Sequence, residues 1–111
     1  MTVTVRPIIP AKIAEAVQTT QYTAVGVSTI IDKFTATNYS AVAAVISVNL
    51  VNPAGSASTA NLVVQTKTLQ PTETYNFPEL VGHILPPGGF ISTLAGTATS
   101  INIRASGREV S

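Results

Sequence analysis

The chain ends in FISTLAGTATSINIRASGREVS, residues 90–111, and this stretch decides the class of fold. Residues 90–95 and 100–105 are rich in small and β-branched side chains, which favour strands, and a Gly-Thr-Ala-Thr loop joins them. In the second run the apolar Ile101 and Ile103 alternate with polar residues, as in a strand that packs one face against a core. The stretch therefore predicts a hairpin of two strands that pave a sheet and carry no reactive group.

The same period of two recurs earlier in the chain. From Val42 to Leu50 every second residue is apolar, and residues 29–37 also alternate before the turn-like Asn-Tyr-Ser at residues 38–40. Asn and Ser favour tight turns because their side chains hydrogen-bond the local backbone. The sequence therefore predicts a β-hairpin that spans residues 27–51.

Further strands are predicted at residues 61–69 and 74–77, with Pro78 ending the second because proline has no N–H to donate. Residues 79–85 have helical spacing of apolar side chains, but the flanking prolines leave room for one turn at most. The pattern predicts an all-β fold, an antiparallel β-sandwich of about seven or eight strands with almost no helix. Its predicted core residues are Ile30, Phe34, Val42, Ile46, Val48, Leu62, Val64, Phe77, Leu80, Ile91, Ile101 and Ile103.

The first ten residues have a different pattern. Pro7 and Pro10 bracket two isoleucines, and proline interrupts the hydrogen bonding of a continuous strand. Residues 1–10 are therefore predicted to form an extended N-terminal arm that orders only on a neighbouring subunit. A single β-sandwich domain is predicted for residues 11–111, in which residues 11–17 fit either two helical turns or a strand.

The composition describes one folded domain with an unusual surface. Of 111 residues, 45% are hydrophobic, which is too many for a disordered chain. Only 10% are charged, against about 25% in a typical soluble domain. A surface with so little charge is interpreted as one that rests in part against a partner. The alternative is a monomer with a Thr-rich sheet face.

Charge and hydropathy also bear on the class of partner. The net charge is +1, and the six cations are spread from Arg6 to Arg108 without a basic patch, so no nucleic-acid partner is predicted. The longest apolar run, residues 41–46, is far shorter than the ~20 residues that span a bilayer, so no membrane partner is predicted. The first residues lack the apolar core of a signal peptide, and we expect a protein that is made soluble.

The residue types needed for catalysis are sparse. His83 is the one histidine, Asp32 is the one aspartate, and no Gly-x-Ser-x-Gly motif is present. Nucleophilic catalysis requires a base beside the nucleophile, and metal sites require clustered carboxylates, imidazoles or thiolates. The chain has no cysteine and its acids are scattered. The sequence therefore predicts a non-enzyme with no catalytic, cofactor-binding or metal-binding residue and no cofactor, in which His83 is a surface or half-buried structural residue.

Several segments carry a resemblance when they are taken in order. They are residues 31–38 with the strand at residues 42–51, the turn at residues 69–74 (LQPTET), residues 89–92 (GFIS) and residues 101–109 (INIRASGRE). Together they resemble small immunoglobulin-like β-sandwich proteins of tailed bacteriophages, in which an "apolar, x, Pro, x, Glu, Thr" turn precedes a middle strand. The resemblance covers residues 28–110. It implies an immunoglobulin-like sandwich and a role as a virion structural protein.

The family implies a virion location, reached after synthesis in the host cytoplasm, and a homo-oligomer that binds the major capsid protein or neck and tail proteins. The leading interpretation is a capsid decoration (cement) protein that clamps adjacent capsid subunits. The alternatives are a neck or tail adaptor that joins rings or attaches fibres, and a receptor- or carbohydrate-binding module. The last is disfavoured because the chain has no Trp, and its Phe residues are expected in the core.

Overall fold

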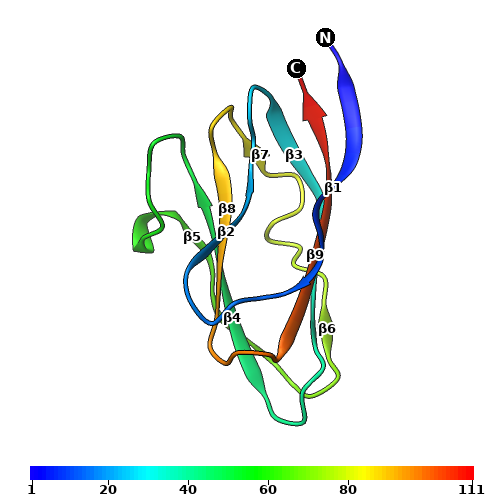
Figure 1. Ribbon diagram of the computed structural model, residues 1–111, viewed down its shortest axis with the longest axis vertical. Helices are drawn as coiled ribbons and strands as arrows, with labels where there is room; N and C mark the ends of the chain where they lie inside the picture. The colour runs from blue at the N-terminus through cyan, green and yellow to red at the C-terminus, as the bar shows by residue number, and fades with distance from the viewer.

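The computed structural model describes all 111 residues and consists of two antiparallel β-sheets packed face to face (Figure 1). The strands are β1 (Val3–Ile13), β2 (Thr19–Thr23), β3 (Ser28–Asn38), β4 (Ala44–Val51), β5 (Leu62–Leu69), β6 (Thr74–Tyr75), β7 (Ile84–Leu85), β8 (Phe90–Ala95) and β9 (Ile101–Val110). The one helical segment is a short 3-10 helix, η1 (Thr59–Asn61), and no helix could cross a membrane. The predicted all-β class and the two-sheet β-sandwich are confirmed.

The strands pair in a nested order on either side of the loop that precedes η1. Working outward from this loop, β4 pairs with β5, β3 with both β6 and β7, β2 with β8, and β1 with β9. Two further pairings, β9 with β3 and β8 with β4, join these pairs into two sheets. Sheet A has the order β1-β9-β3-β6, with β7 also on β3, and sheet B has the order β2-β8-β4-β5.

This order differs from that of an immunoglobulin domain. In an immunoglobulin sandwich the first two strands lie in the same sheet. Here β1 lies in sheet A and β2 lies in sheet B, and most later connections also cross from one sheet to the other (Figure 1). The immunoglobulin-like part of the fold prediction is therefore wrong in its topology.

Both predicted hairpins have the right strands and the wrong pairing. β3 and β4 lie in different sheets, as do β8 and β9, and β4–β5 is the one hydrogen-bonded pair of consecutive strands. Asn38 explains the first crossing, because its buried Nδ2 donates to the Val42 carbonyl (2.8 Å) and to the Leu69 carbonyl (3.0 Å). These bonds fix a corner that carries the chain across to sheet B. A two-residue hairpin turn would instead have kept the next strand in sheet A, paired with β3.

The predicted N-terminal arm is instead an edge strand of the sandwich. β1 pairs with β9 from Val3 to Ile13, and Ile8 and Ile9 are only 4% and 1% exposed. Pro7 and Pro10 fall where the register shifts, between Arg6 and Ile9 and again before Lys12. Proline is tolerated at such bulges because no ladder hydrogen bond is required of it there. The division at residue 10 is therefore wrong. Of the two alternatives for residues 11–17, the strand holds as far as Ile13.

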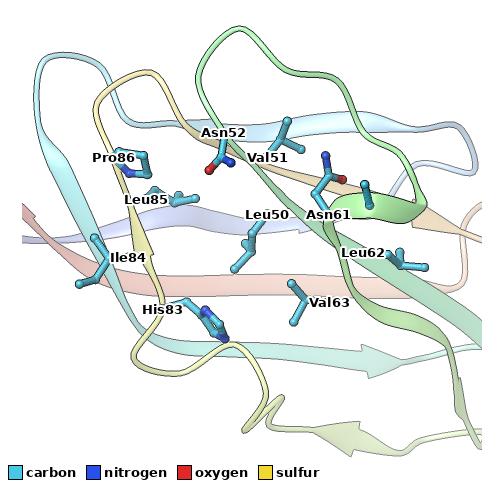
Figure 2. A pocket seen from close by; sticks show the side chains of 11 residues that line it. Leu50, Val51, Asn52, Asn61, Leu62, Val63, His83, Ile84, Leu85 and Pro86 are labelled. Atoms are coloured by element: carbon cyan, nitrogen blue, oxygen red, sulfur yellow. The ribbon is translucent and has the colours of Figure 1, made fainter.

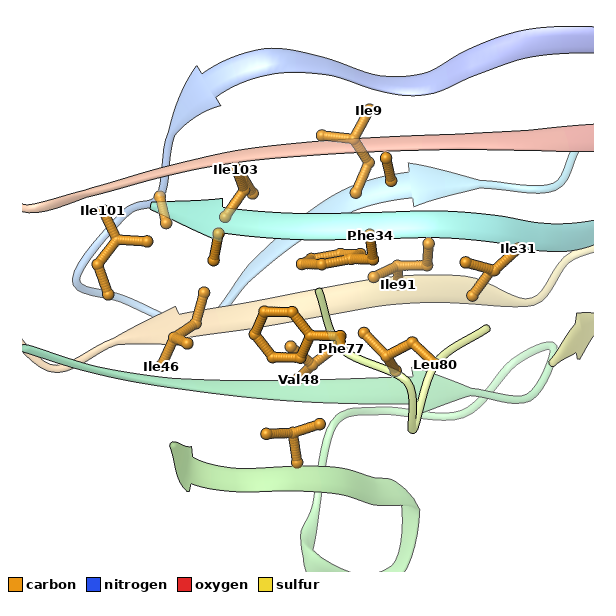
Figure 3. Packing of buried hydrophobic residues seen from close by; sticks show 14 of the residues in the cluster. Ile9, Ile31, Phe34, Ile46, Val48, Phe77, Leu80, Ile91, Ile101 and Ile103 are labelled. Atoms are coloured by element: carbon orange, nitrogen blue, oxygen red, sulfur yellow. The ribbon is translucent and has the colours of Figure 1, made fainter. Parts of the chain in front are cut away.

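The core lies between the sheets, where Figure 3 shows side chains from both layers interleaved. The Phe34 and Phe77 rings pack edge to face at its centre, with ring centres 5.0 Å apart. Phe77 and Leu80 come from the irregular segment between β6 and β7, which fills the side of the sandwich where sheet A has its shortest strands. The predicted core residues that are buried are Phe34, Ile46, Val48, Val64, Phe77, Leu80, Ile91, Ile101 and Ile103.

The remaining core predictions fail for local reasons. A β-bulge between Ile31 and Lys33 shifts the alternation of β3 by one residue, so Ile31 is buried and Ile30 is only half-buried on the outer side. Val42 precedes β4 and is 63% exposed. Leu62, in the edge strand β5, and Phe90, at the start of β8, are half-buried.

Candidate interaction surfaces

The two sheets differ sharply in charge. β2, β4 and β8 contain no charged residue, and β5 contains only Lys67, whose Nζ lies over the Tyr75 ring of sheet A, 4.4 Å from its centre. The outward surface of sheet B therefore carries no charge. The strands of sheet A, in contrast, contain Arg6, Lys12, Asp32, Lys33, Arg104, Arg108 and Glu109.

We call the outward surface of sheet B the sheet B face; it is formed by Gln18, Ser47, Asn49, Gln65, Thr66, Ser92 and Leu94. Its polar groups bond to one another. Gln18 Nε2 donates to Ser92 Oγ (2.7 Å) and, more weakly, to Asn49 Oδ1 (3.4 Å). The Thr66 backbone N–H donates to Ser47 Oγ (2.8 Å). Because these groups already have partners, covering them with another protein costs little in lost hydration.

The loop at residues 52–61 folds back over the sheet B face. Asn49, although it points outward, is only 3% exposed, since its Nδ2 donates to the Ser58 carbonyl (2.8 Å) and to Asn61 Oδ1 (2.7 Å). Ser58 in turn caps η1 by accepting a hydrogen bond from the Ala60 N–H. This arrangement leaves a hollow of about 270 Å³ between the loop and Leu94, and its lining contains no charged side chain.

A second cleft opens between the two sheets beside β7 (Figure 2). Its volume is about 340 Å³, and it is lined by both hydrophobic and polar residues, with Leu50 and Val63 from sheet B facing Leu85 from sheet A. His83 lies at its rim and is exposed. The lining includes two Asn side chains but no carboxylate, hydroxyl or amine. The cleft therefore offers His83 no partner for proton transfer.

Tyr22, outside this cleft, joins the two sheets. Tyr22 of β2 donates to Glu109 Oε2 of β9 (2.5 Å) and so links sheet B to sheet A. The Thr29 hydroxyl lies 2.6 Å from the same phenolic oxygen, and Arg6 Nη1 lies 3.2 Å from Glu109 Oε1. Burial, together with the hydrogen bond to Glu109, raises the pKa of Tyr22. We refer to this group as the Tyr22–Glu109 link.

Asp32 and His83, the one aspartate and the one histidine of the chain, are not hydrogen-bonded to each other. Asp32 accepts from Arg108 through both carboxylate oxygens, at 2.9–3.1 Å. No group of three or more His, Cys, Asp or Glu side chains is placed to hold a metal ion. Apart from the low overall charge, no pattern in the sequence indicated the sheet B face, because its residues come from separate segments that only the strand pairing brings together.

Comparisons with protein-family models, with characterised proteins and with solved structures find no match to this chain.

Proposed function

We propose that the protein is a non-enzymatic structural component of a bacteriophage virion, a capsid decoration protein that binds the major capsid protein. The observation that carries the proposal is the sheet B face. Removing an unpaired charge from water costs on the order of several kcal/mol per ion, whereas burying a hydrogen-bonded amide or hydroxyl costs far less. A four-stranded face without charge can therefore pack against a regular shell.

The topology supports the same proposal. When β6 and β7, which share β3 as their partner, are counted as one strand, the two sheets have the strand order of a jelly roll. We propose this finer assignment in place of an immunoglobulin-like fold. Jelly rolls form many viral capsid proteins and also lectins. The fold alone does not distinguish a capsid protein from a lectin, so the choice between them depends on the surface residues.

The aromatic residues argue against a sugar-binding use. Carbohydrate platforms rely on exposed aromatic rings, and the chain has three tyrosines and no tryptophan. Tyr22 is held in the Tyr22–Glu109 link, and Tyr75 packs between Phe77 and Lys67. Tyr39 alone is exposed, at 48%. A single exposed ring on a turn does not make a platform.

Quantitative mass spectrometry of purified particles tests this function. The particles are taken from a host strain whose DNA carries the coding sequence, and the copy number is measured against the major capsid protein. We expect hundreds of copies per particle. A count near six or twelve would instead identify a neck or tail adaptor, and absence from the particles would overturn a virion role.

A further inference from the structure

Two cations of this chain have no partner within the molecule, and both lie on the outer side of sheet A. Three of the six cations form ion pairs: Arg6 with Glu109, Lys12 with Glu15, and Arg108 with Asp32. Lys67 is placed over the Tyr75 ring. Lys33 and Arg104 remain.

These two side chains occupy one square of the β3–β9 ladder. Lys33 is opposite Ser106, and Thr35 is opposite Arg104. Phe34 and Ala105, which lie between them in sequence, are 0% and 1% exposed, so the four residues of the square point away from the core. The cations therefore lie on one diagonal and the hydroxyls on the other, and diagonal neighbours in such a ladder are about 7–8 Å apart.

The square encloses a hollow of about 300 Å³, lined by these four residues and Ala105; we call it the cationic hollow. It exists because the short Ser and Thr side chains leave space between the long Lys and Arg side chains. The Ser106 hydroxyl makes no hydrogen bond within the chain, and the Thr35 hydroxyl makes only a long one, 3.5 Å, to the Arg104 carbonyl. Two charged donors and two hydroxyls therefore face the same space.

No acid of this chain neutralises the cationic hollow. The strands of sheet A contain five of the six cations and only two of the five acids, Asp32 and Glu109. Asp32 is the acid next to the hollow in sequence, and both of its oxygens are engaged by Arg108. Like charges placed diagonally across two strands repel each other, and an anion bound between them removes this repulsion.

We propose that the cationic hollow binds a side-chain carboxylate in an acidic segment of a partner protein. A guanidinium presents a planar fork of donors that matches a carboxylate, and an ammonium and hydroxyls can complete the set. A nucleic acid fits less well, because its binding depends on many cations that follow successive phosphates. The proposal is independent of the sheet B face, which lies on the other side of the sandwich.

The test is a titration of the ¹⁵N-labelled protein with a hexaglutamate peptide, followed by amide chemical shifts at low ionic strength. We expect saturable shifts centred on residues 33–35 and 104–106. The variant K33Q/R104Q should bind at least about tenfold more weakly, since both charged hydrogen bonds to the carboxylate are lost. The matched control K12Q/K67Q removes the same net charge from other sites and should change the affinity less than about twofold. A hexaglutamine peptide should not bind.

Three results would overturn the proposal. Equal weakening in both double variants would mean that the peptide responds only to net charge. Shifts spread over the whole surface, or none at millimolar peptide, would mean that the hollow is no site. Displacement of the peptide by an equimolar DNA duplex, with the same residues shifted, would assign the hollow to nucleic acid. Thermal melts of both variants confirm that they remain folded.

Discussion

Tyr22 shows how one hydroxyl can join the two layers of the sandwich. Its single phenolic hydrogen goes to Glu109, so the fully buried Thr29 hydroxyl must be the donor in the 2.6 Å contact between them. Tyr22→Phe removes the acceptor for Thr29 and a donor for Glu109. We expect a loss of about 1–3 kcal/mol in the free energy of unfolding, measured by urea denaturation. Tyr39→Phe, at the exposed tyrosine, is the control and should change it little. Equal stability of the Tyr22 variant would show that the link contributes nothing.

The same residue predicts a dependence on alkaline pH. The pKa of Tyr22 is raised in the folded state by burial and by the hydrogen bond to Glu109. A raised pKa means that the stabilisation is complete below the unfolded value, about 10, and is lost as pH rises through the folded value. We therefore expect thermal stability to fall above about pH 10, and less steeply in Tyr22→Phe. If thermal stability falls equally with pH in the unmodified protein and in Tyr22→Phe, Tyr22 is not the group responsible.

Core isoleucines test which face of each strand is inward. Ile46 of β4 and Ile103 of β9 are 0% exposed, so replacement of either by Ala leaves a cavity and should cost roughly 2–5 kcal/mol. Ile84, which is 63% exposed, is the matched control, and its replacement by Ala should cost less than about 1 kcal/mol. Chemical denaturation measures all three. A loss at Ile84 as large as that at Ile103 would reverse the assigned faces.

At the scale of the element, β1 decides whether the N-terminus is part of the fold. Deletion of residues 2–10 removes the buried Ile8 and Ile9, each of which contributes about 1.5–3 kcal/mol by burial, and also exposes the edge of β9. Because whole domains are stable by only about 5–15 kcal/mol, we expect a large fall in melting temperature. Deletion of residues 2–5, which are exposed, should have a much smaller effect. An unchanged melting temperature for the longer deletion would support the prediction that residues 1–10 form an arm outside the fold.

The sequence located the strands better than it paired them. Alternation in β4 and β9 depends only on which side chains are apolar. Both strands were predicted near their observed starts, although β9 continues to Val110, beyond the predicted end at Ala105. Pairing depends on the corners. Asn38 and Gly96 look like hairpin turn residues, but each is fixed by bonds that cross between segments: Asn38 to Leu69, and the Gly96 N–H to the Val45 carbonyl (2.9 Å). Contacts between distant segments leave no periodic signal in the sequence.

The candidate surfaces were beyond prediction for the same reason. Lys33 and Arg104 are far apart in sequence and become neighbours only through the β3–β9 register, which the bulge after Ile31 sets. The low charge of the chain was visible in its composition, and it suggested a covered surface. The position of that surface required knowledge of which strands share sheet B.

At the scale of the whole molecule, the two sheets give the protein two unlike sides. The sheet B face carries no charge, and Gln18, Ser47, Asn49 and Ser92 on it are hydrogen-bonded, whereas sheet A carries ion pairs and the cationic hollow. The chain termini lie side by side on sheet A, where the Ser111 N–H donates to the Thr2 carbonyl (2.9 Å; Figure 1). For the proposed decoration protein, the asymmetry predicts a fixed orientation, with sheet B against the capsid and sheet A outward.

The sheet B face is proposed to contact the major capsid protein, and a matched pair of added charges tests this proposal. Leu94→Lys places a charge on the sheet B face, and Val5→Lys places one on sheet A at a residue that is 75% exposed. Each variant competes with the unmodified chain for incorporation into particles, measured by mass spectrometry. We expect Leu94→Lys to be incorporated at least about tenfold less, because its charge would be buried unpaired, and Val5→Lys to be incorporated normally. Normal incorporation of Leu94→Lys, with exclusion of Val5→Lys, would place the contact on sheet A and contradict the claim.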